Sequence, residues 1–242
     1  MGYQIAGPAL FPVLYAQGRL VRRRALRLPE PPGARSGMVA GEAPAGAAVW
    51  ATPLRLLVVG DSAAAGVGAA SQAQALVGQV AAELARGGPV AWRLVARTGA
   101  TAAGTRRHLT GLAAEPCDVA VTSLGLNDVT AGRPVGDALA DVAAVVALLR
   151  DRFGARHVVV SGVPPLGRFP AVPQPLRWYL GRRAAALDAA VAAWAAGRPG
   201  VEHLPLDLAD VSQMAADGFH PGPAAYAEWG RTVAGRVREA LG

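Results

Sequence analysis

The sequence predicts an α/β fold in which one doubly wound parallel sheet carries helices on both of its faces. From residue 54 onward, short apolar runs alternate five times with longer segments of helical character, and this alternation is typical of such sheets. Apolar residues make up 52% of the 242 residues, which is enough to fill the core of one domain. For a five-stranded sheet of this kind we expect the strand order 2-1-3-4-5.

The first half of the pattern begins with a short apolar run at 54–59, as expected for a buried parallel strand. A helix is predicted over 70–86, where a Gly-Gly-Pro sequence ends it. A second strand follows at 90–96 and a second helix at 101–114. The third strand, at 118–124, is again a mainly apolar run.

The second half continues with a long helix over 135–153, which a glycine ends. A Val-rich strand spans 157–163, and a helix over 175–196 follows a Pro-rich loop. A weaker fifth strand at 201–207 precedes the last helix at 223–241. Because the strands are parallel, their carboxyl ends meet at one edge, where such sheets place their binding sites.

The residues before this pattern are expected to form an N-terminal arm and a linker, 1–53, ahead of a main domain over 54–242. The linker part, 29–53, is rich in Pro, Gly and Ala and is predicted to be irregular. Residues 5–17 are mostly apolar but too few to span a membrane, which takes about 20. Packing of the arm on the domain is the favoured interpretation, and contact of residues 5–24 with a membrane surface is the alternative.

The formal charge of +7 comes from arginine, because all 24 basic residues are Arg. Arginine suits phosphate and nucleic-acid recognition. These arginines are spread along the chain, however, few aromatic residues accompany them, and no nucleic-acid motif is visible. A solvated, arginine-rich surface is therefore expected, and nucleic acid is not an expected partner. Attraction to anionic membranes or substrates is the second interpretation.

Cysteine and histidine are too few to indicate a disulfide or a metal site. The single cysteine, Cys117, excludes an internal disulfide, and His108, His157 and His203 lack metal-ligand spacing. We expect neither a metal nor a cofactor. The lack of disulfides is typical of a reducing compartment, so we expect a cytoplasmic protein, with a membrane-peripheral one as the alternative.

Two motifs after predicted strands carry reactive side chains. Ser62 lies in Gly-Asp-Ser after the first strand, and a serine on a tight strand-to-helix turn is well placed as a nucleophile. Its common alternative role is a helix N-cap. Asp217 and His220 follow the fifth strand, and this spacing lets the carboxylate hold the imidazole so that the ring can act as a base. A solvent-facing polar loop is the alternative.

Two further motifs offer hydrogen-bond donors. Gly99 follows the second strand, where a glycine can bring its N–H close to a ligand or can serve as an ordinary turn residue. Asn127 follows the third strand, where its amide could donate to an oxyanion or cap a turn. Together the four motifs supply a nucleophile, a base with its orienting acid, and two oxyanion donors, which are the groups that acyl transfer needs.

These motifs resemble the four sequence blocks of the SGNH hydrolases, also called GDSL esterases and lipases. The resemblance runs from the first strand to the C-terminus. It places Ser62 at the nucleophile position and Asp217 and His220 as the acid and base of a triad. It also places Gly99 and Asn127, together with the Ser62 N–H, in the oxyanion hole. The resemblance implies a three-layer α/β/α fold and esterase or lipase activity without a metal.

The function that follows is hydrolysis of carboxylic esters, either small or medium acyl esters or lysophospholipids, through an acyl-enzyme. The alternative is a non-catalytic module that binds a phosphate or another anion at the helix after the first strand. The two are distinguished by Asp217 and His220, which anion binding does not require. The sequence specifies neither the acyl chain and alcohol nor the oligomeric state.

The segment after the fourth strand is the candidate substrate pocket. It contains Phe169, Trp178 and Tyr179 among several prolines, and a stiff aromatic loop near the site can line an acyl or aryl pocket. An equal alternative is that these residues pack the next helix onto the sheet.

Overall fold

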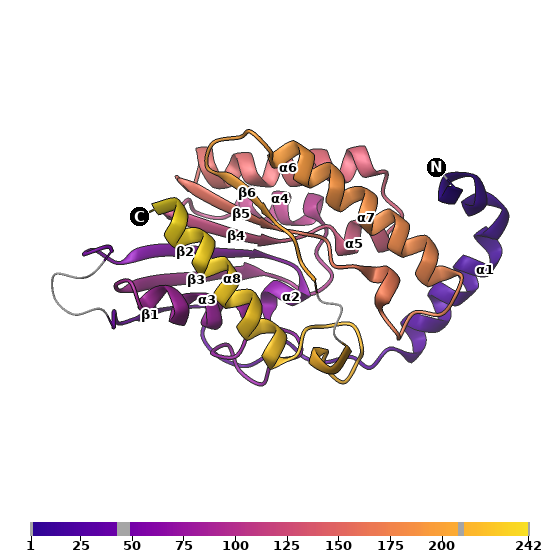
Figure 1. The fold of residues 1–242 in the computed structure, drawn as a ribbon, viewed down its shortest axis with the longest axis horizontal. Coiled ribbons are helices and arrows are strands. Elements are labelled where there is room, and N and C mark those ends of the chain that lie inside the picture. Colours follow the sequence, from indigo (N-terminus) through magenta and orange to yellow (C-terminus); the bar gives the residue numbers. More distant parts are fainter. Residues whose placement is uncertain (1, 43–48, 208–210, 242) are drawn as a thin grey trace.

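A six-stranded sheet forms the centre of the computed structural model, which describes residues 2–42, 49–207 and 211–241 (Figure 1). The strand order is β1-β3-β2-β4-β5-β6. The strands are β1 (Ser36–Val39), β2 (Leu54–Gly60), β3 (Val90–Ala96), β4 (Val119–Ser123), β5 (His157–Ser161) and β6 (Val201–Leu204). Strands β2 to β6 are parallel to their neighbours, and β1 runs antiparallel to β3. The order predicted for the five parallel strands is therefore confirmed.

The sheet has one strand more than predicted. Strand β1 lies within 29–53, which was expected to be irregular throughout, and it pairs Ser36 with Arg93 and Val39 with Val90. It is a four-residue edge strand with three exposed residues. A strand this short and this exposed leaves no apolar run in the sequence. Its position follows from its pairing with the edge of β3.

Eight α-helices accompany the sheet within the described part of the chain. They are α1 (Gly2–Arg24), α2 (Ser62–Ala65), α3 (Leu76–Ala85), α4 (Ala102–Gly111), α5 (Leu126–Thr130), α6 (Val135–Asp151), α7 (Leu176–Ala195) and α8 (Pro223–Leu241). The helix expected from residue 70 begins only at Leu76, because residues 66–75 form turns. The buried Gln72 side chain stabilises these turns by donating to the backbone oxygen atoms of Pro31 and Ala65.

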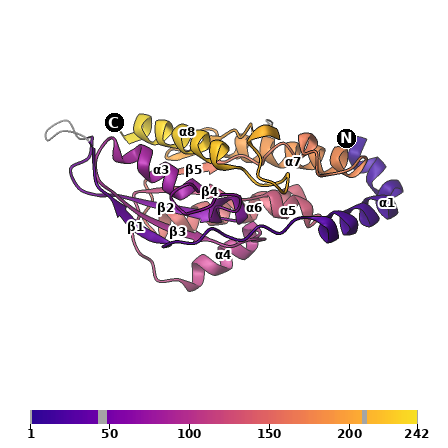
Figure 2. The ribbon, with the colours of Figure 1, turned by 90° about the horizontal axis from the view of Figure 1, so that it is seen from below.

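Two apolar cores lie on opposite faces of the sheet. In β2, Leu56 and Val58 belong to the core under α3 and α8, whereas Leu57 and Val59 belong to the core under α4, α6 and α7. This alternation follows from the two-residue period of a strand. Figure 2 shows α8 and α4 on opposite sides of the strands. The three layers agree with the α/β/α arrangement that the family resemblance implies.

The N-terminal arm is helical and lies against the start of α7. Its helix continues through Pro12. Three of its apolar side chains pack against the core: Leu10, Leu14 and Val21. The Gln17 amide donates to Gln174 O at 2.7 Å and accepts from Leu176 N at 3.1 Å. Among the described helices, none has both the length and the apolar character needed to cross a membrane.

Candidate active site

The four motifs come together at the carboxyl edge of the sheet. Ser62 begins α2 directly after β2, Gly99 lies in the turn after β3, and Asn127 lies in α5 after β4. Because β3, β2 and β4 are neighbours, these three positions converge. The fourth motif belongs to the loop between β6 and α8 and reaches the same place (Figure 1).

The turn that carries Ser62 requires a glycine before it. Gly60 has φ +159°, and a Cβ there would lie 2.2 Å from Ser123 O in the neighbouring strand. Asp61 then caps the four-residue helix α2 by accepting from the Ala63 N–H at 3.1 Å. Ser62 is therefore fixed at the first position of a single helical turn, with 7% of its surface exposed.

His220 links Ser62 to Asp217. Its Nε2 lies 2.8 Å from Ser62 Oγ, and its Nδ1 lies 2.5 Å from Asp217 Oδ2. The other oxygen, Asp217 Oδ1, accepts from the backbone N–H groups of Phe219 and His220, both at 3.0 Å. Burial alone would raise the Asp217 pKa, but these hydrogen bonds outweigh it and lower the pKa. The carboxylate is therefore ionised at neutral pH and can orient the imidazole.

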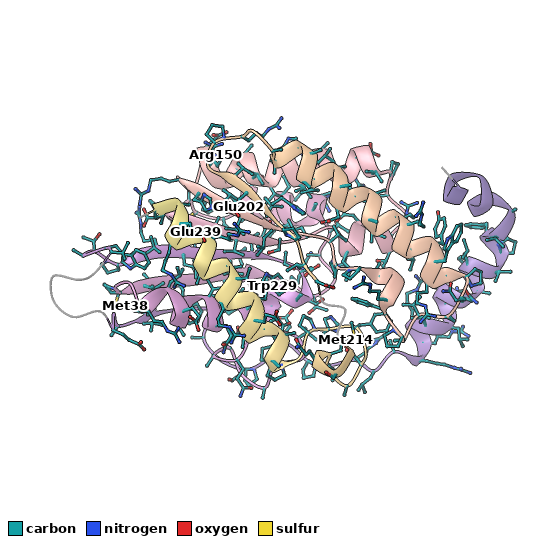
Figure 3. All side chains as sticks on the ribbon, viewed as in Figure 1. Met38, Arg150, Glu202, Met214, Trp229 and Glu239 are labelled. Atoms are coloured by element: carbon teal, nitrogen blue, oxygen red, sulfur yellow. The ribbon has the colours of Figure 1, made fainter. Side chains whose placement is uncertain are left out.

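The loop that carries Asp217 and His220 is itself held by backbone bonds. Met214, labelled in Figure 3, forms an antiparallel bridge with Pro221. The Ala215 N–H donates to His220 O at 2.9 Å. The imidazole is thus presented by a small closed hairpin just before α8.

Two backbone N–H groups near Ser62 are open to a ligand. Gly99 is the third residue of a turn closed by Ala100 N and Arg97 O at 3.0 Å, and its φ of +78° favours glycine. No atom lies within 4 Å of where its side chain would project. Among the described residues, neither the Gly99 N–H nor the Ser62 N–H has an acceptor. Both can therefore donate to an incoming oxygen.

The Asn127 amide is already engaged. Its Nδ2 donates to Ala100 O at 3.0 Å and lies 3.4 Å from Asp61 Oδ2. Asp61 is buried and also accepts from Ser123 Oγ at 3.2 Å. Burial raises the Asp61 pKa to about 6, although its hydrogen bonds act in the opposite direction. The position of Asn127 after a strand is visible in the sequence, but its contacts with Ala100 and Asp61 are not.

Asp128, the residue after Asn127, connects two helices. Its buried carboxylate accepts from the Ala102 N–H at 2.9 Å and lies 3.4 Å from the Arg133 Nε. Burial is the main cause that raises its pKa. This side chain fixes the start of α4 against α5 and does not contact Ser62 or His220.

The three residues predicted to line the substrate pocket have different surroundings in the structure. Phe169 is buried, and its ring meets the edge of Phe219 with 6.4 Å between centroids. It therefore supports the loop that carries His220. Trp178 and Tyr179 lie in the first turn of α7, where Trp178 is exposed and the Tyr179 hydroxyl accepts from Arg183 at 3.2 Å. Their role in a pocket stays a prediction.

The remaining titratable groups make separate contacts. Burial raises the pKa of the Cys117 thiol to about 11, so it is protonated at neutral pH. His203 Nε2 lies 2.8 Å from Asp188 Oδ1, and His157 Nε2 lies 3.5 Å from Glu202. Within the described ranges, no three His, Cys, Asp or Glu side chains are grouped so that they could hold a metal ion.

Comparisons with known proteins identify the family of this chain. The model of the GDSL-like lipase/acylhydrolase family matches residues 58–228, which include all four motifs. A GDSL-like esterase of Mycobacterium tuberculosis is 32% identical over 188 residues, covering 72% of this chain and 58% of that protein. The chain thus spans a little over half the length of this relative.

Solved structures share the fold at low sequence identity. A carbohydrate acetylesterase from Sinorhizobium meliloti is 20% identical, with a TM-score of 0.57 over 77% of this chain and 99% of that one. A lipase from a goat rumen metagenome is 14% identical, with a TM-score of 0.64 over 78% of this chain and 100% of that one. Both likenesses show a shared fold.

Proposed function

The chain belongs to the GDSL-like lipase/acylhydrolase family, and from this premise we propose that it hydrolyses carboxylic esters with Ser62 as the nucleophile. The observation that carries the proposal is the continuous series of contacts from Ser62 Oγ through His220 to Asp217, at 2.8 and 2.5 Å. Both distances are within hydrogen-bond range. A serine in this arrangement can lose its proton as it attacks.

In the proposed first step, His220 Nε2 takes the proton of Ser62 as Oγ bonds to the ester carbonyl carbon. The imidazolium that forms is stabilised by the Asp217 carboxylate at Nδ1. His220 then gives its proton to the leaving alcohol as the ester C–O bond breaks. The acyl group stays on Ser62 Oγ.

The developing oxyanion would be held by the Ser62 and Gly99 N–H groups, which have no acceptor among the described residues. Asn127 would supply the third donor. Its 3.0 Å bond to Ala100 O keeps the amide in place, and the substrate oxygen would replace the longer 3.4 Å contact with Asp61. Each such donor is typically worth about 10²–10³ in rate.

In the second step a water molecule takes the place of the alcohol. His220 accepts a proton from this water as the water oxygen attacks the acyl carbon. It then returns the proton to Ser62 Oγ as the bond between Oγ and the acyl carbon breaks. The products are the carboxylic acid and the free enzyme. His220 is the only titratable side chain that contacts Ser62 in the described structure, so one base serves both steps.

The geometry favours this reading over an anion-binding module. The helix that begins at Ser62 has four residues, and a helix dipole needs several aligned turns to attract an anion. The cap of this helix is the Asp61 side chain, which would repel a phosphate when ionised. Anion binding also leaves the contacts between His220 and Asp217 without a use.

For substrates we propose small or medium acyl esters, with lysophospholipids as the larger class. The solved structures that share the fold include a carbohydrate acetylesterase and a lipase, so the fold accommodates both short and long acyl groups. The discriminating measurement is the rate of hydrolysis of p-nitrophenyl acetate, butyrate, octanoate and palmitate. A maximum at acetate or butyrate indicates a small-ester enzyme, and a maximum at octanoate or palmitate indicates a lipid substrate.

The catalytic role of Ser62 is tested by comparing the wild type with Ser62→Ala on the best of these esters. We expect kcat to fall by about 10⁴–10⁶, since the oxyanion hole and substrate binding leave a residual rate. Circular dichroism checks that the variant is folded, and an active-site phosphonate should label Ser62 in the wild type only. Undiminished turnover by Ser62→Ala, or a folded wild type that is inactive on every ester, would contradict the proposal.

A further inference from the structure

The exposed apolar side chains of the described residues are concentrated on α1 and just after its end. Eight large apolar side chains are exposed in the described part of the chain, and five of them lie between residues 11 and 26. Four of them, Phe11, Val13, Tyr15 and Leu20, lie on α1, and Leu26 lies two residues after its end. Phe11 is 63% exposed. An apolar surface of this kind on one element marks an interaction site.

The same segment carries most of the excess positive charge. Residues 1–29 contain five arginines and no acidic residue, whereas the rest of the chain has 19 arginines against 17 acidic residues. The five are Arg19, Arg22, Arg23, Arg24 and Arg27. None of them forms an ion pair with another described residue. Their charge is therefore available to an anionic partner.

Aromatic and arginine side chains are combined in one stripe along α1. The rings of Phe11 and Tyr15 stack at 6.0 Å between centroids, and the Arg19 guanidinium lies 5.9 Å from the Tyr15 ring. An aromatic body beside a long cationic side chain suits the boundary between acyl chains and lipid headgroups. The apolar residues come first and the arginines follow at the end of the helix.

The opposite face of α1 ties it to the end of the domain that holds the candidate site. Gln17 is bonded to Gln174 and Leu176 at the start of α7. The loop before α7 includes Phe169, whose ring meets Phe219 beside His220. Figures 1 and 2 both show α1 beyond the carboxyl ends of the strands.

From these observations we propose that the exposed surface of α1, defined by Phe11, Tyr15, Arg19 and Arg22 to Arg24, docks on the surface of an anionic lipid bilayer. Docking would turn the candidate active site toward the bilayer. A second copy of the chain is a poorer occupant, because a two-fold contact would bring five unpaired arginines from each copy together. Lipid phosphates, in contrast, neutralise these charges while the aromatic rings enter the headgroup region.

The proposal deepens the proposed function, because a docked enzyme would meet the ester bonds of lipids, and it rests on that function only for this consequence. The binding itself is measured without catalysis. The full chain is mixed with sedimenting vesicles of phosphatidylcholine alone or of phosphatidylcholine with phosphatidylglycerol, at low and high salt. We expect binding to the anionic vesicles that weakens as salt is added.

Two pairs of variants make the test specific. The first pair is Arg22→Gln/Arg23→Gln/Arg24→Gln and the charge-matched Arg86→Gln/Arg107→Gln/Arg231→Gln, whose positions lie directly after α3, on α4 and on α8. Each arginine near an anionic surface is worth about fivefold in affinity, so the α1 triple variant should lose about a hundredfold. The control triple variant should lose much less.

The second pair tests the apolar part. Phe11→Ser is compared with Met38→Ser, since Met38 is 66% exposed on β1 at the far end of the molecule (Figure 3). Only Phe11→Ser should weaken vesicle binding. Circular dichroism and hydrolysis of a soluble ester check that each variant is folded.

Three outcomes would overturn the proposal. They are no binding to anionic vesicles, equal losses for the α1 and control variants, and α1-dependent self-association in sedimentation equilibrium without vesicle binding. If vesicles bind as expected but no ester is hydrolysed, the docking proposal stands and the proposed function fails. If esters are hydrolysed but the protein does not bind vesicles, the proposed function stands and the docking proposal fails.

Discussion

The two carboxylate oxygens of Asp217 make different contacts next to Ser62. One carboxylate oxygen accepts from His220 Nδ1, and the other accepts from the N–H groups of Phe219 and His220. The first contact orients the base, and the second closes the loop. A substitution that keeps the loop but changes the imidazole contact therefore separates orientation from folding.

Asp217→Asn is such a substitution. The amide oxygen can still accept from the two backbone N–H groups, but an amide NH₂ facing Nδ1 would favour the imidazole tautomer that has its proton on Nε2. A base protonated at Nε2 cannot accept the Ser62 proton, so we expect kcat to fall by about 10³–10⁴ with the fold retained. Ester hydrolysis and urea unfolding measure the two effects. Asp217→Ala is the comparison, since it should lower stability as well, and an Asp217→Asn enzyme with nearly normal kcat would contradict the assigned role.

Asp61 should give the folded protein an unusual dependence on pH. Its pKa is raised from 3.8 to about 6 by burial, so between these values the folded state binds more protons than the unfolded state. The free energy of unfolding contributed by Asp61 is therefore greatest below the lower value and is lost as pH rises through about 6. A shift of this size corresponds to about 3 kcal/mol.

We therefore expect Asp61→Asn to become more stable relative to the wild type as pH rises through this range. Urea unfolding at several pH values measures the difference. Asp118→Asn is the control of opposite sign, because the Arg55 hydrogen bond lowers the Asp118 pKa and stabilisation by that carboxylate is lost as pH falls. If the two variants show the same pH trend, the burial argument for Asp61 is wrong.

The sequence predicts which residues lie close together in the site. It predicts less well which hydrogen bonds and ring contacts these residues form. Ser62, Gly99 and Asn127 follow adjacent parallel strands, so their convergence follows from the alternation of strands and helices alone. The bond from Asn127 to Ala100 O depends on where a side chain points after a turn, and the contact of Phe169 with Phe219 joins residues 50 positions apart. Neither is encoded in a local pattern.

The elements that carry the site depend on two glycines with different tasks. Gly60 ends β2, and any side chain there would lie 2.2 Å from Ser123 O. Gly99 also has a positive φ angle, +78°, but no atom lies within 4 Å of the position that its Cβ would take. The first glycine permits close approach of two strands, and the second permits only a turn.

Gly60→Ala and Gly99→Ala should therefore differ in severity. Gly99→Ala adds backbone strain of about 1 kcal/mol, whereas Gly60→Ala must also push β2 and β4 apart beside Ser62. We expect Gly60→Ala to be the more destabilising in urea unfolding and to lose most of its esterase activity. Equal losses of stability in the two variants would show that the approach of β2 to Ser123 is not tight.

Elements were predictable from sequence where burial made them apolar. Strands β2, β4 and β5 are buried along nearly their whole length. The apolar runs in the sequence predict their bounds to within two residues. Exposed or polar elements left no such pattern. Strand β1 was missed for this reason, and the helix expected at residue 70 starts later because Gln72 bonds to the backbone of a turn.

Helix α8 packs on one face of the sheet and also contacts the segment that follows α2. Tyr226 and Trp229 of α8 are buried and stack on each other, and Trp229 donates to Ser161 Oγ in β5 at 3.2 Å (Figure 3). Tyr226 OH donates to Val67 O, just after α2. Helix α8 thus holds the segment of Ser62 at one point and follows directly after the loop of His220. The alternation of elements predicts that a last helix covers the sheet, but not that this helix also contacts the segment after Ser62.

Helices α8 and α3 are in close contact, and two glycines of α8 can test whether this contact sets the position of α8. Gly230 of α8 lies so near α3 that a Cβ there would be 2.6 Å from Gln79 Cβ and 3.0 Å from Gln79 C. Gly235, five residues further along α8, has no atom within 4 Å of the position that its Cβ would take. Both glycines are in the interior of one helix, so the intrinsic gain from Gly to Ala is the same, about 1 kcal/mol.

Gly235→Ala should therefore stabilise the protein slightly and leave activity unchanged. Gly230→Ala should lose that gain to overpacking, which typically costs about 1–3 kcal/mol, and should move α8 outward from α3. Because the loop of His220 leads directly into α8, we expect this shift to lengthen the contact between His220 and Ser62 and to lower kcat. Urea unfolding and ester hydrolysis of the two variants measure both effects. A Gly230→Ala protein as stable and as active as Gly235→Ala would mean that the position of α8 on α3 does not set the geometry of the site.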